Sequence, residues 1–170
     1  TCALPIWILM LIEKVKAYLA GYGLDDRIRE FPVSSATVAL AAAAIGVEEA
    51  RIAKSITLHD KDGGCILVVC AGDYKIDNAG FKAKFGFKPR MMSHEEALAF
   101  TGHAVGGICP FALPEGVKVY LDNSLRRFQT VFPAAGTSNS AVEVNCDELF
   151  LASGALGWEN LCKPSVPASV

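Results

Sequence analysis

Apolar residues recur at helical spacing near the start of the chain. They run from Leu11 to Leu19 with charged residues between them, a pattern that predicts an amphipathic helix ending at Gly21 and Gly23. A short apolar run over residues 28–31 follows, and Pro32 closes it. We expect a short strand there.

The next segments alternate between an alanine-rich helix and a hairpin. Ser34 and Ser35 offer N-caps to a helix that runs to Ile45, where Gly46 ends it. Residues 51–59 and 65–71 read as strands. The Asp- and Gly-rich turn between them predicts a β-hairpin.

The rest of the chain mixes helices and strands without a regular βαβ rhythm. The expected helices cover residues 78–85, 93–101 and 147–153, and the expected strands cover 117–121, 128–132 and 141–144. Ser93 and Glu96 have the spacing of a capping box. We therefore predict an α+β fold with a mixed, mostly antiparallel sheet that curls toward a barrel and is flanked by helices.

The length of 170 residues suits one domain with a single core. We assign that domain to residues 10–163 and a loose, Pro- and Ser-rich tail to residues 164–170. Residues 3–12 are strongly apolar but too short to span a bilayer, and they lack the features of a signal peptide. We expect Met10 to be the natural start and residues 1–9 to be a non-native or disordered extension. The alternative is an apolar arm that lies on the domain.

Composition narrows the classes of function. A net charge of -2 argues against a protein that coats DNA electrostatically. No Cys or His cluster has metal-ligand spacing, so we expect no metal site. The six cysteines fit reduced thiols of a cytoplasmic protein.

Lys54 is the first candidate for chemistry. Strand alternation places it on the same face as Ile52, Ile56 and Leu58. An unpaired ammonium is costly to bury, so such a lysine faces either a cavity or a ligand. The alternative is a lysine whose amine reaches the solvent from near the start of the strand. Strand phase alone leaves both open.

A glycine-rich loop over residues 101–111 is the second candidate. Exposed N–H groups around Gly106 and Gly107 can bind a carbonyl oxygen or an oxyanion. The spacing fits neither a P-loop nor a dinucleotide fingerprint. A tight connection between a helix and a strand is the alternative, and spacing alone favours it. The small, polar loop over residues 134–140 could complete a pocket wall.

Local positive charge gathers between Asp73 and Arg90. Lysines alternate there with aromatic residues, a pattern that could hold an RNA end by phosphate contact. The alternative is a solvated helix face whose aromatic side chains lie in the core. The candidate RNA-binding residues are Lys82, Lys84, Lys88 and Arg90.

The order of several short segments resembles the YbaK/EbsC family, also called the YbaK and prolyl-tRNA-synthetase-associated editing domain family. The segments are Ser35-Ala-Thr37, Arg51-Ile-Ala-Lys-Ser55, Ala71-Gly-Asp73, Thr101-Gly-His-Ala-Val-Gly-Gly-Ile-Cys-Pro-Phe111, Val119-Tyr-Leu-Asp122 and Ala134-Ala-Gly136. The resemblance covers about residues 11–163. The loop at 134–136 is Ala-Ala-Gly, whereas cysteinyl-tRNA(Pro) deacylases tend to have Ser at its start. This difference weakens assignment to that subgroup.

The resemblance implies a trans-editing deacylase that hydrolyses the ester of mischarged aminoacyl-tRNA without a cofactor. It carries the family's strand lysine onto Lys54 and its Gly-Gly loop onto Gly106 and Gly107. Lys54 would bind the terminal phosphate or the carbonyl end of the substrate, and the loop N–H groups would polarise the carbonyl. We expect substrate contacts at Phe31, Thr37, Ile108, Ala135 and Gly136. We also expect a monomer or weak dimer in the cytoplasm, in contact with an aminoacyl-tRNA synthetase and with no membrane.

Two other classes remain open. One is a non-catalytic module that binds tRNA ends or nucleotides through the same pocket. The other is a general esterase or amidase, which the absence of an evident activated nucleophile argues against.

Overall fold

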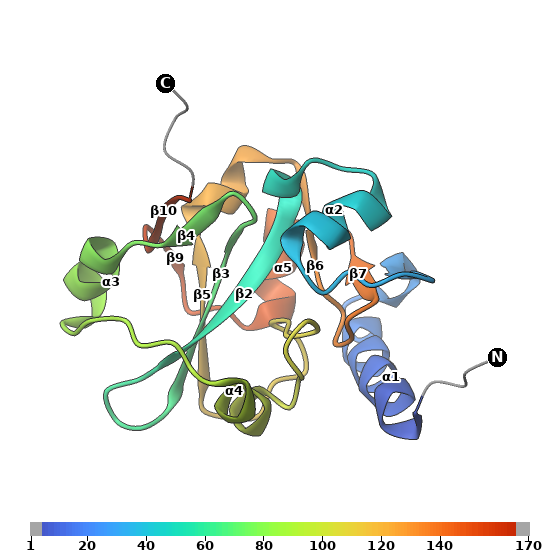
Figure 1. The fold of residues 1–170 in the computed structure, drawn as a ribbon, viewed down its shortest axis with the longest axis horizontal. Helices are drawn as coiled ribbons and strands as arrows, with labels where there is room; N and C mark the ends of the chain where they lie inside the picture. Colours follow the sequence, from blue (N-terminus) through green and yellow to red (C-terminus); the bar gives the residue numbers. More distant parts are fainter. Residues whose placement is uncertain (1–4, 166–170) are drawn as a thin grey trace.

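The computed structural model describes residues 5–165 (Figure 1). The helices are α1 (Ile6–Ala20), α2 (Val38–Ile45), α3 (Asn78–Phe85), α4 (His94–Thr101) and α5 (Cys146–Ser153), with short 3₁₀ turns at Asp25–Arg27, Glu49–Arg51 and Asn123–Arg127. The strands are β1 (Ile28–Glu30), β2 (Ile52–His59), β3 (Cys65–Ala71), β4 (Tyr74–Ile76), β5 (Val117–Asp122), β6 (Thr130–Pro133), β7 (Ser140–Val142), β8 (Val144–Asn145), β9 (Trp158–Glu159) and β10 (Cys162–Pro164).

The main sheet is mixed and has the order β8-β6-β2-β3-β5-β9. Its centre is the β2–β3 hairpin, which is antiparallel from Ala53↔Ala71 to His59↔Cys65. β6 pairs with β2 in parallel, and β5 pairs with β3 in parallel. Two small antiparallel sheets, β1-β7 and β4-β10, accompany the main sheet. The predicted α+β fold with a curled, mixed sheet is confirmed.

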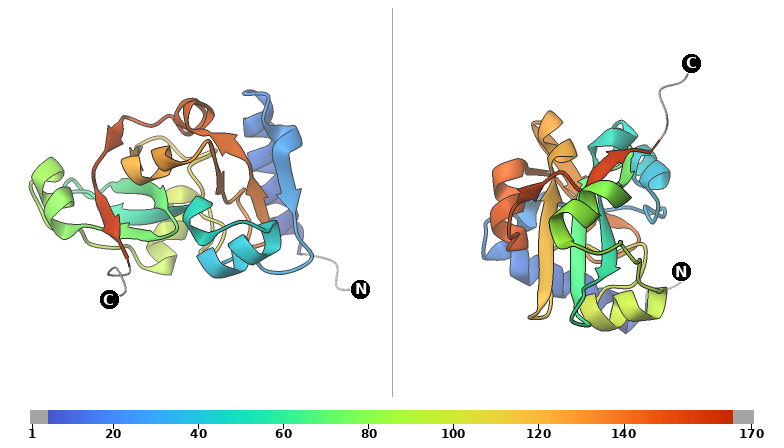
Figure 2. Two further views of the ribbon diagram at one scale, coloured as in Figure 1. Left: turned by 90° about the horizontal axis from the view of Figure 1, so that it is seen from above. Right: turned by 90° about the vertical axis from the view of Figure 1, so that its left-hand side faces the viewer.

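Both faces of the sheet are covered. β3 is buried along its whole length, as expected of a near-continuous apolar run. On one face, Leu67 and Val69 pack with side chains of α1 and α5. On the other face, Ile66 and Val68 pack against Phe81 of α3. Figure 2 (left) shows α3 at one end of the molecule and α1 at the other.

A third, smaller cluster lies under α2, where its alanines contact Ile52 of β2 and Phe132 of β6. The alanine-rich sequence of α2 therefore has the close packing partner that such a helix requires. Thr37 caps the helix by accepting a hydrogen bond from the Leu40 N–H. The N-caps predicted at Ser34 and Ser35 are wrong, because both residues lie in the extended segment before Thr37.

Other boundaries differ at the ends of the chain. α1 begins at Ile6 and thus includes residues 6–9, which the sequence assigned to an extension. At the other end, β10 reaches Pro164, the first residue of the predicted loose tail, and pairs with Tyr74. Residues 1–4 and 166–170 lie outside the described part of the chain. The short strands β4, β9 and β10 had no sequence signal of their own.

Candidate functional site

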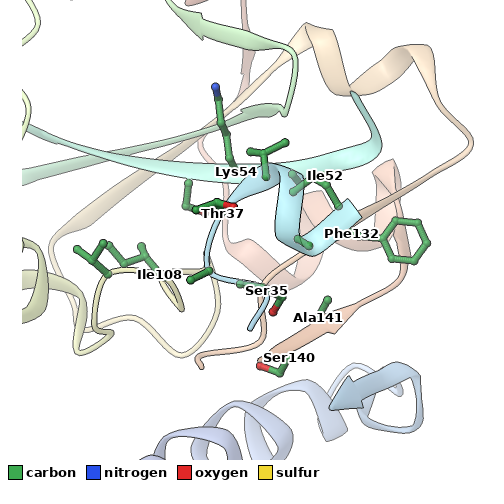
Figure 3. A pocket seen from close by; sticks show the side chains of 16 residues that line it. Ser35, Thr37, Ile52, Lys54, Ile108, Phe132, Ser140 and Ala141 are labelled. Carbon is green, nitrogen blue, oxygen red and sulfur yellow. The ribbon is translucent and has the colours of Figure 1, made fainter. Parts of the chain in front are cut away.

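A pocket of about 210 Å³ lies where α2 faces the start of β2. Its walls come from residues 35–38 at the start of α2, the first half of β2, the loop around Gly106 and the end of β6. Figure 3 shows Ser35, Thr37 and Ile108 on one side of β2, facing Ser140 and Ala141. Segments that are about 100 residues apart thus meet around one cavity.

The pocket exists because β2 loses its neighbour partway along one edge. β6 pairs with β2 only at Ile52↔Phe132 and Ala53↔Pro133. Farther on, the same edge is covered again, because the Met92 N–H donates to the Thr57 carbonyl and the His59 N–H donates to the Arg90 carbonyl. We call the stretch between these two contacts, at Ser55, the open edge of β2.

Lys54 lines this pocket on the predicted strand face. On that face Ile52 belongs to the cluster under α2, and Leu58 belongs to the cluster around α3. Lys54 lies between the two clusters and is only half-buried. Figure 3 shows its amine extending from β2 on the side opposite Ile108 and Ser140. The lysine therefore combines the two alternatives: the residue lines a cavity, and its amine extends away from the other lining side chains.

Ionisable groups are sparse in the lining. Among the described residues that line the pocket, Lys54 alone has an ionisable side chain. The Lys54 amine makes no ion pair with the described part of the chain. The pocket thus offers a cation free to bind an anion or a carbonyl, beside hydroxyls and small apolar groups.

The glycine loop forms a tight turn at the pocket wall. The Gly107 N–H donates to the Ala104 carbonyl at 2.9 Å, and Gly106 has a φ of 95°, which favours glycine. A Cβ on Gly106 would lie 3.1 Å from the Ala36 Cβ. Gly106 thus lines the pocket and lets the loop approach the start of α2.

Gly107 has a different role from the one predicted. Its N–H is committed to the Ala104 carbonyl within the turn, so it does not point to a substrate in this structure. A Cβ on Gly107 would lie 2.7 Å from backbone atoms of Thr137. The expectation that both glycine N–H groups polarise a carbonyl is therefore corrected: Gly107 allows two loops to pack together, and Gly106 is the one that lines the pocket.

His103 holds the base of this loop. It is fully buried, and its Nε2 lies 2.8 Å from the Phe111 carbonyl. Burial lowers the pKa of His103 from its ordinary value, so the ring is neutral and its Nε2–H donates. Cys109, beside the ring, is also fully buried, and burial raises the pKa of its thiol to about 12. A thiol held neutral in this way is a packing group and not a nucleophile.

The structure divides the predicted substrate contacts into two groups. Thr37 and Ile108 line the pocket. Phe31, Ala135 and Gly136 are not part of that lining. Phe31 binds Asn139 through two hydrogen bonds, Ala135 lies in the main core, and Gly136 packs against Val15 of α1. These three residues contact other parts of the protein and do not line the pocket.

Ser55 and Ser140 also line the pocket. Ser140 belongs to the loop over residues 134–140 that was expected to complete a pocket wall, whereas Ser55 was not predicted. The Ser140 hydroxyl bonds Thr137 within the protein. The Ser55 Oγ is shielded from solvent and has no hydrogen-bond partner among residues 5–165. Serine in a strand carries no signal of its own, and only the break in the β2–β6 ladder singles out Ser55.

The predicted RNA-binding residues lie away from the pocket, on and after α3 (Figure 1). Lys82, Lys84, Lys88 and Arg90 are all exposed. Lys84 forms an ion pair with Glu159 at 2.8 Å. The aromatic residues of this segment pack together in the core cluster around α3, as the alternative interpretation held. The exposed cations form a patch separate from the cavity.

Within residues 5–165, no group of three or more His, Cys, Asp or Glu is placed to hold a metal ion. No helix in this range is long and apolar enough to cross a membrane.

Comparisons with known proteins identify the kind of domain. A sequence model described as the aminoacyl-tRNA editing domain matches residues 33–150. The uncharacterised protein YwhH of Bacillus subtilis is 47% identical over 154 residues, which are 91% of this chain and 98% of YwhH. EbsC of Enterococcus faecalis, a proposed Cys-tRNA(Pro)/Cys-tRNA(Cys) deacylase, is 25% identical over 61% of this chain and 63% of its own length.

A solved structure has the same fold along nearly the whole chain. It is the crystal structure of a proposed trans-editing enzyme for prolyl tRNA synthetase, with a TM-score of 0.80 and 27% sequence identity. The match covers 89% of this chain and 96% of that protein. The residues matched by the sequence model include the start of α2, all of β2 and the glycine loop, so they include every residue that lines the pocket.

Proposed function

The chain belongs to the aminoacyl-tRNA editing domain family, and from this we propose that it is a trans-editing deacylase of mischarged tRNA. The supporting observation is the pocket itself. It is small, it is lined by hydroxyls and apolar groups, and its single ionisable side chain in the described lining is Lys54. Such a cavity suits an aminoacyl group with a small, uncharged side chain.

The proposed reaction is ester hydrolysis. The oxygen of a water molecule bonds to the acyl carbon, the bond from that carbon to the ribose oxygen breaks, and the ribose oxygen takes a proton. The products are the free amino acid and a tRNA with its terminal hydroxyls free. An aminoacyl ester is already activated, so positioning and carbonyl polarisation suffice for catalysis.

The lining offers no carboxylate or imidazole as a general base within the described residues. We propose that the vicinal ribose hydroxyl of the substrate delivers the water. Lys54 binds the terminal phosphate or the developing oxyanion. Gly106 shapes the wall that holds the acyl group in place. In this assignment Lys54 acts as an electrostatic group and not as a nucleophile.

The body of the tRNA requires a second surface. We propose that Lys82, Lys88 and Arg90 bind the RNA backbone near α3 by phosphate contacts. An editing enzyme that acts in trans meets its substrate where tRNAs are charged, so we expect a cytoplasmic protein that works beside a synthetase.

The test is a deacylation screen across a panel of mischarged tRNAs. The wild-type protein should hydrolyse at least one, and Lys54→Ala should lower kcat/KM by about 100-fold, the usual loss for one oxyanion-stabilising group. Lys118→Ala is the matched control, because Lys118 pairs with Asp60 at the far end of the hairpin. Absence of hydrolysis across the whole panel would refute the proposal.

A second candidate follows from the lack of a base in the lining. A pocket without a protein base also suits a module that binds an aminoacylated end and does not cleave it. Binding of aminoacyl-tRNA without turnover would select this alternative, and Lys54→Ala would then weaken binding alone.

A further inference from the structure

The open edge of β2 exposes backbone groups that the fold does not use. Backbone groups of alternate residues point to the same edge of a strand. Ala53 uses this edge for β6, and Thr57 and His59 use it for residues 90–92. The Ser55 N–H and carbonyl must therefore point to the same edge, into the pocket that Ser55 lines.

Ser55 has a third polar group without a partner. Its Oγ is shielded from solvent and makes no hydrogen bond within the described chain. Neither the N–H nor the carbonyl of Ser55 takes part in the loop and turn contacts of residues 5–165. Buried polar groups are nearly always paired, and each one left unpaired costs about 1–3 kcal/mol. The Ser55 Oγ is such a group, and the N–H and carbonyl of the same residue face the pocket, so a ligand bound there can supply partners for all three.

We infer that the aminoacyl group of the substrate pairs with β2 at Ser55 as a strand of one residue. The acyl carbonyl accepts a hydrogen bond from the Ser55 N–H, and the α-ammonium donates to the Ser55 carbonyl and Oγ. This inference rests on the proposed function, and it adds what that function does not specify: recognition of the amino group. No carboxylate lines the described pocket, so neutral acceptors must bind that ammonium.

The amino and carbonyl groups of an aminoacyl ester match the N–H and carbonyl of Ser55 at the open edge of β2. An aminoacyl group has an amino donor and a carbonyl acceptor at the spacing of one strand residue, which is the pairing used when a peptide adds to a sheet edge. The α-ammonium makes charge-assisted hydrogen bonds, which are stronger than neutral ones. An acyl group without the amine should therefore bind less well in the same cavity.

The test measures binding of stable amide analogues, so it does not depend on turnover. The probes are 3′-alanylamino-3′-deoxyadenosine and its 3′-propionylamino counterpart, which lacks only the amine. Calorimetry should show the alanyl analogue binding about tenfold tighter to the wild-type protein, as expected for hydrogen bonds to a charged group. Ser55→Ala should weaken the alanyl analogue about three- to tenfold and leave the propionyl analogue unchanged.

Ser153→Ala is the matched control, since its hydroxyl bonds only the Phe150 carbonyl of its own helix and should affect neither analogue. Ser55→Ala should also fold as stably as the wild type, because its hydroxyl has no partner to lose. Equal binding of the two analogues, an equal loss for both in Ser55→Ala, or no binding of either overturns the inference. Deacylation of aminoacyl-tRNA by the same preparation would show that the proposed function still holds.

Discussion

Along one edge, β2 pairs with β3 over nearly its whole length. Along the other edge, it pairs with β6 near its start and with residues 90–92 near its end. At the end with Thr57, Leu58 and His59, the backbone is bonded on both edges, and Leu58 is fully buried. Around Lys54 and Ser55, just after the short pairing of Ile52 and Ala53 with β6, the second edge is open and both residues are only half-buried. One strand thus contains a structural half and a binding half.

This difference shows how a sheet makes a site without any irregular residue in the strand itself. β6 ends at Pro133, and the chain then turns away through residues 134–139. The vacated edge becomes the floor of the pocket. If this view is correct, changes at the closed end should affect stability, and changes at the open end should affect binding.

The largest expected effect on stability is at the closed end. Leu58→Ala should lower the free energy of unfolding by about 3 kcal/mol, because it leaves a cavity in the cluster of Ile66, Val68 and Phe81. Urea unfolding measures this change, with the exposed Leu98→Ala as a control expected within about 0.5 kcal/mol of wild type. If Leu58→Ala folds but no longer deacylates tRNA, the closed end of β2 contributes to function as well as to stability, and the proposed difference between the two parts of the strand is wrong.

A smaller effect is expected at the wall of the open end. Gly107→Ala should cost about 2 kcal/mol, because the added Cβ would lie 2.7 Å from the Thr137 backbone and two loops would have to separate. Deacylation should fall as well, since the same turn shapes the pocket. Gly157→Ala is the control, because its Cβ would meet only Glu159 at 3.6 Å. If both variants are equally stable, the close packing of the loops is not needed.

The smallest effect concerns pH. Burial lowers the pKa of His103, and the Lys14 amine acts in the same direction. Because the folded pKa lies below the unfolded value of about 6.5, this contribution to stability is complete above that pH and is lost as the pH falls toward the folded pKa. Between about pH 7.5 and about pH 5.5 we expect a loss of about 1 kcal/mol.

Urea unfolding at the two pH values measures this dependence. His103→Gln should flatten it, since glutamine has an amide donor for the Phe111 carbonyl and does not titrate. His59 and His94 are not fully buried and remain in the variant as an internal reference. An unchanged slope in His103→Gln would assign the pH dependence to other groups.

Local patterns were enough to predict most of the fold. The β2–β3 hairpin, α3 and the capping box of α4 follow from short-range periodicity and capping, and the structure confirms each. The strand phase of Lys54 was also correct. The short strands β9 and β10 could not be predicted, because two or three residues form a strand only when a distant partner is already in place.

The site was only partly predictable, for the same reason. Lys54, Thr37, Gly106 and Ile108 have sequence signals and line the pocket. The separate roles of Gly106 and Gly107 depend on which loop each one contacts, and adjacent residues of one type cannot show this. Ser55 has no distinctive sequence at all, because its importance comes from the place where β6 stops.

The length of the open edge has a consequence for solubility. An exposed strand edge invites other chains to add to it, which leads to aggregation. Here the gap is bounded by β6 on one side and by the contacts of Thr57 on the other. A gap of one residue is too short to template a strand from another molecule. The protein can therefore keep an unpaired edge available for a single amino acid and still resist self-association through it.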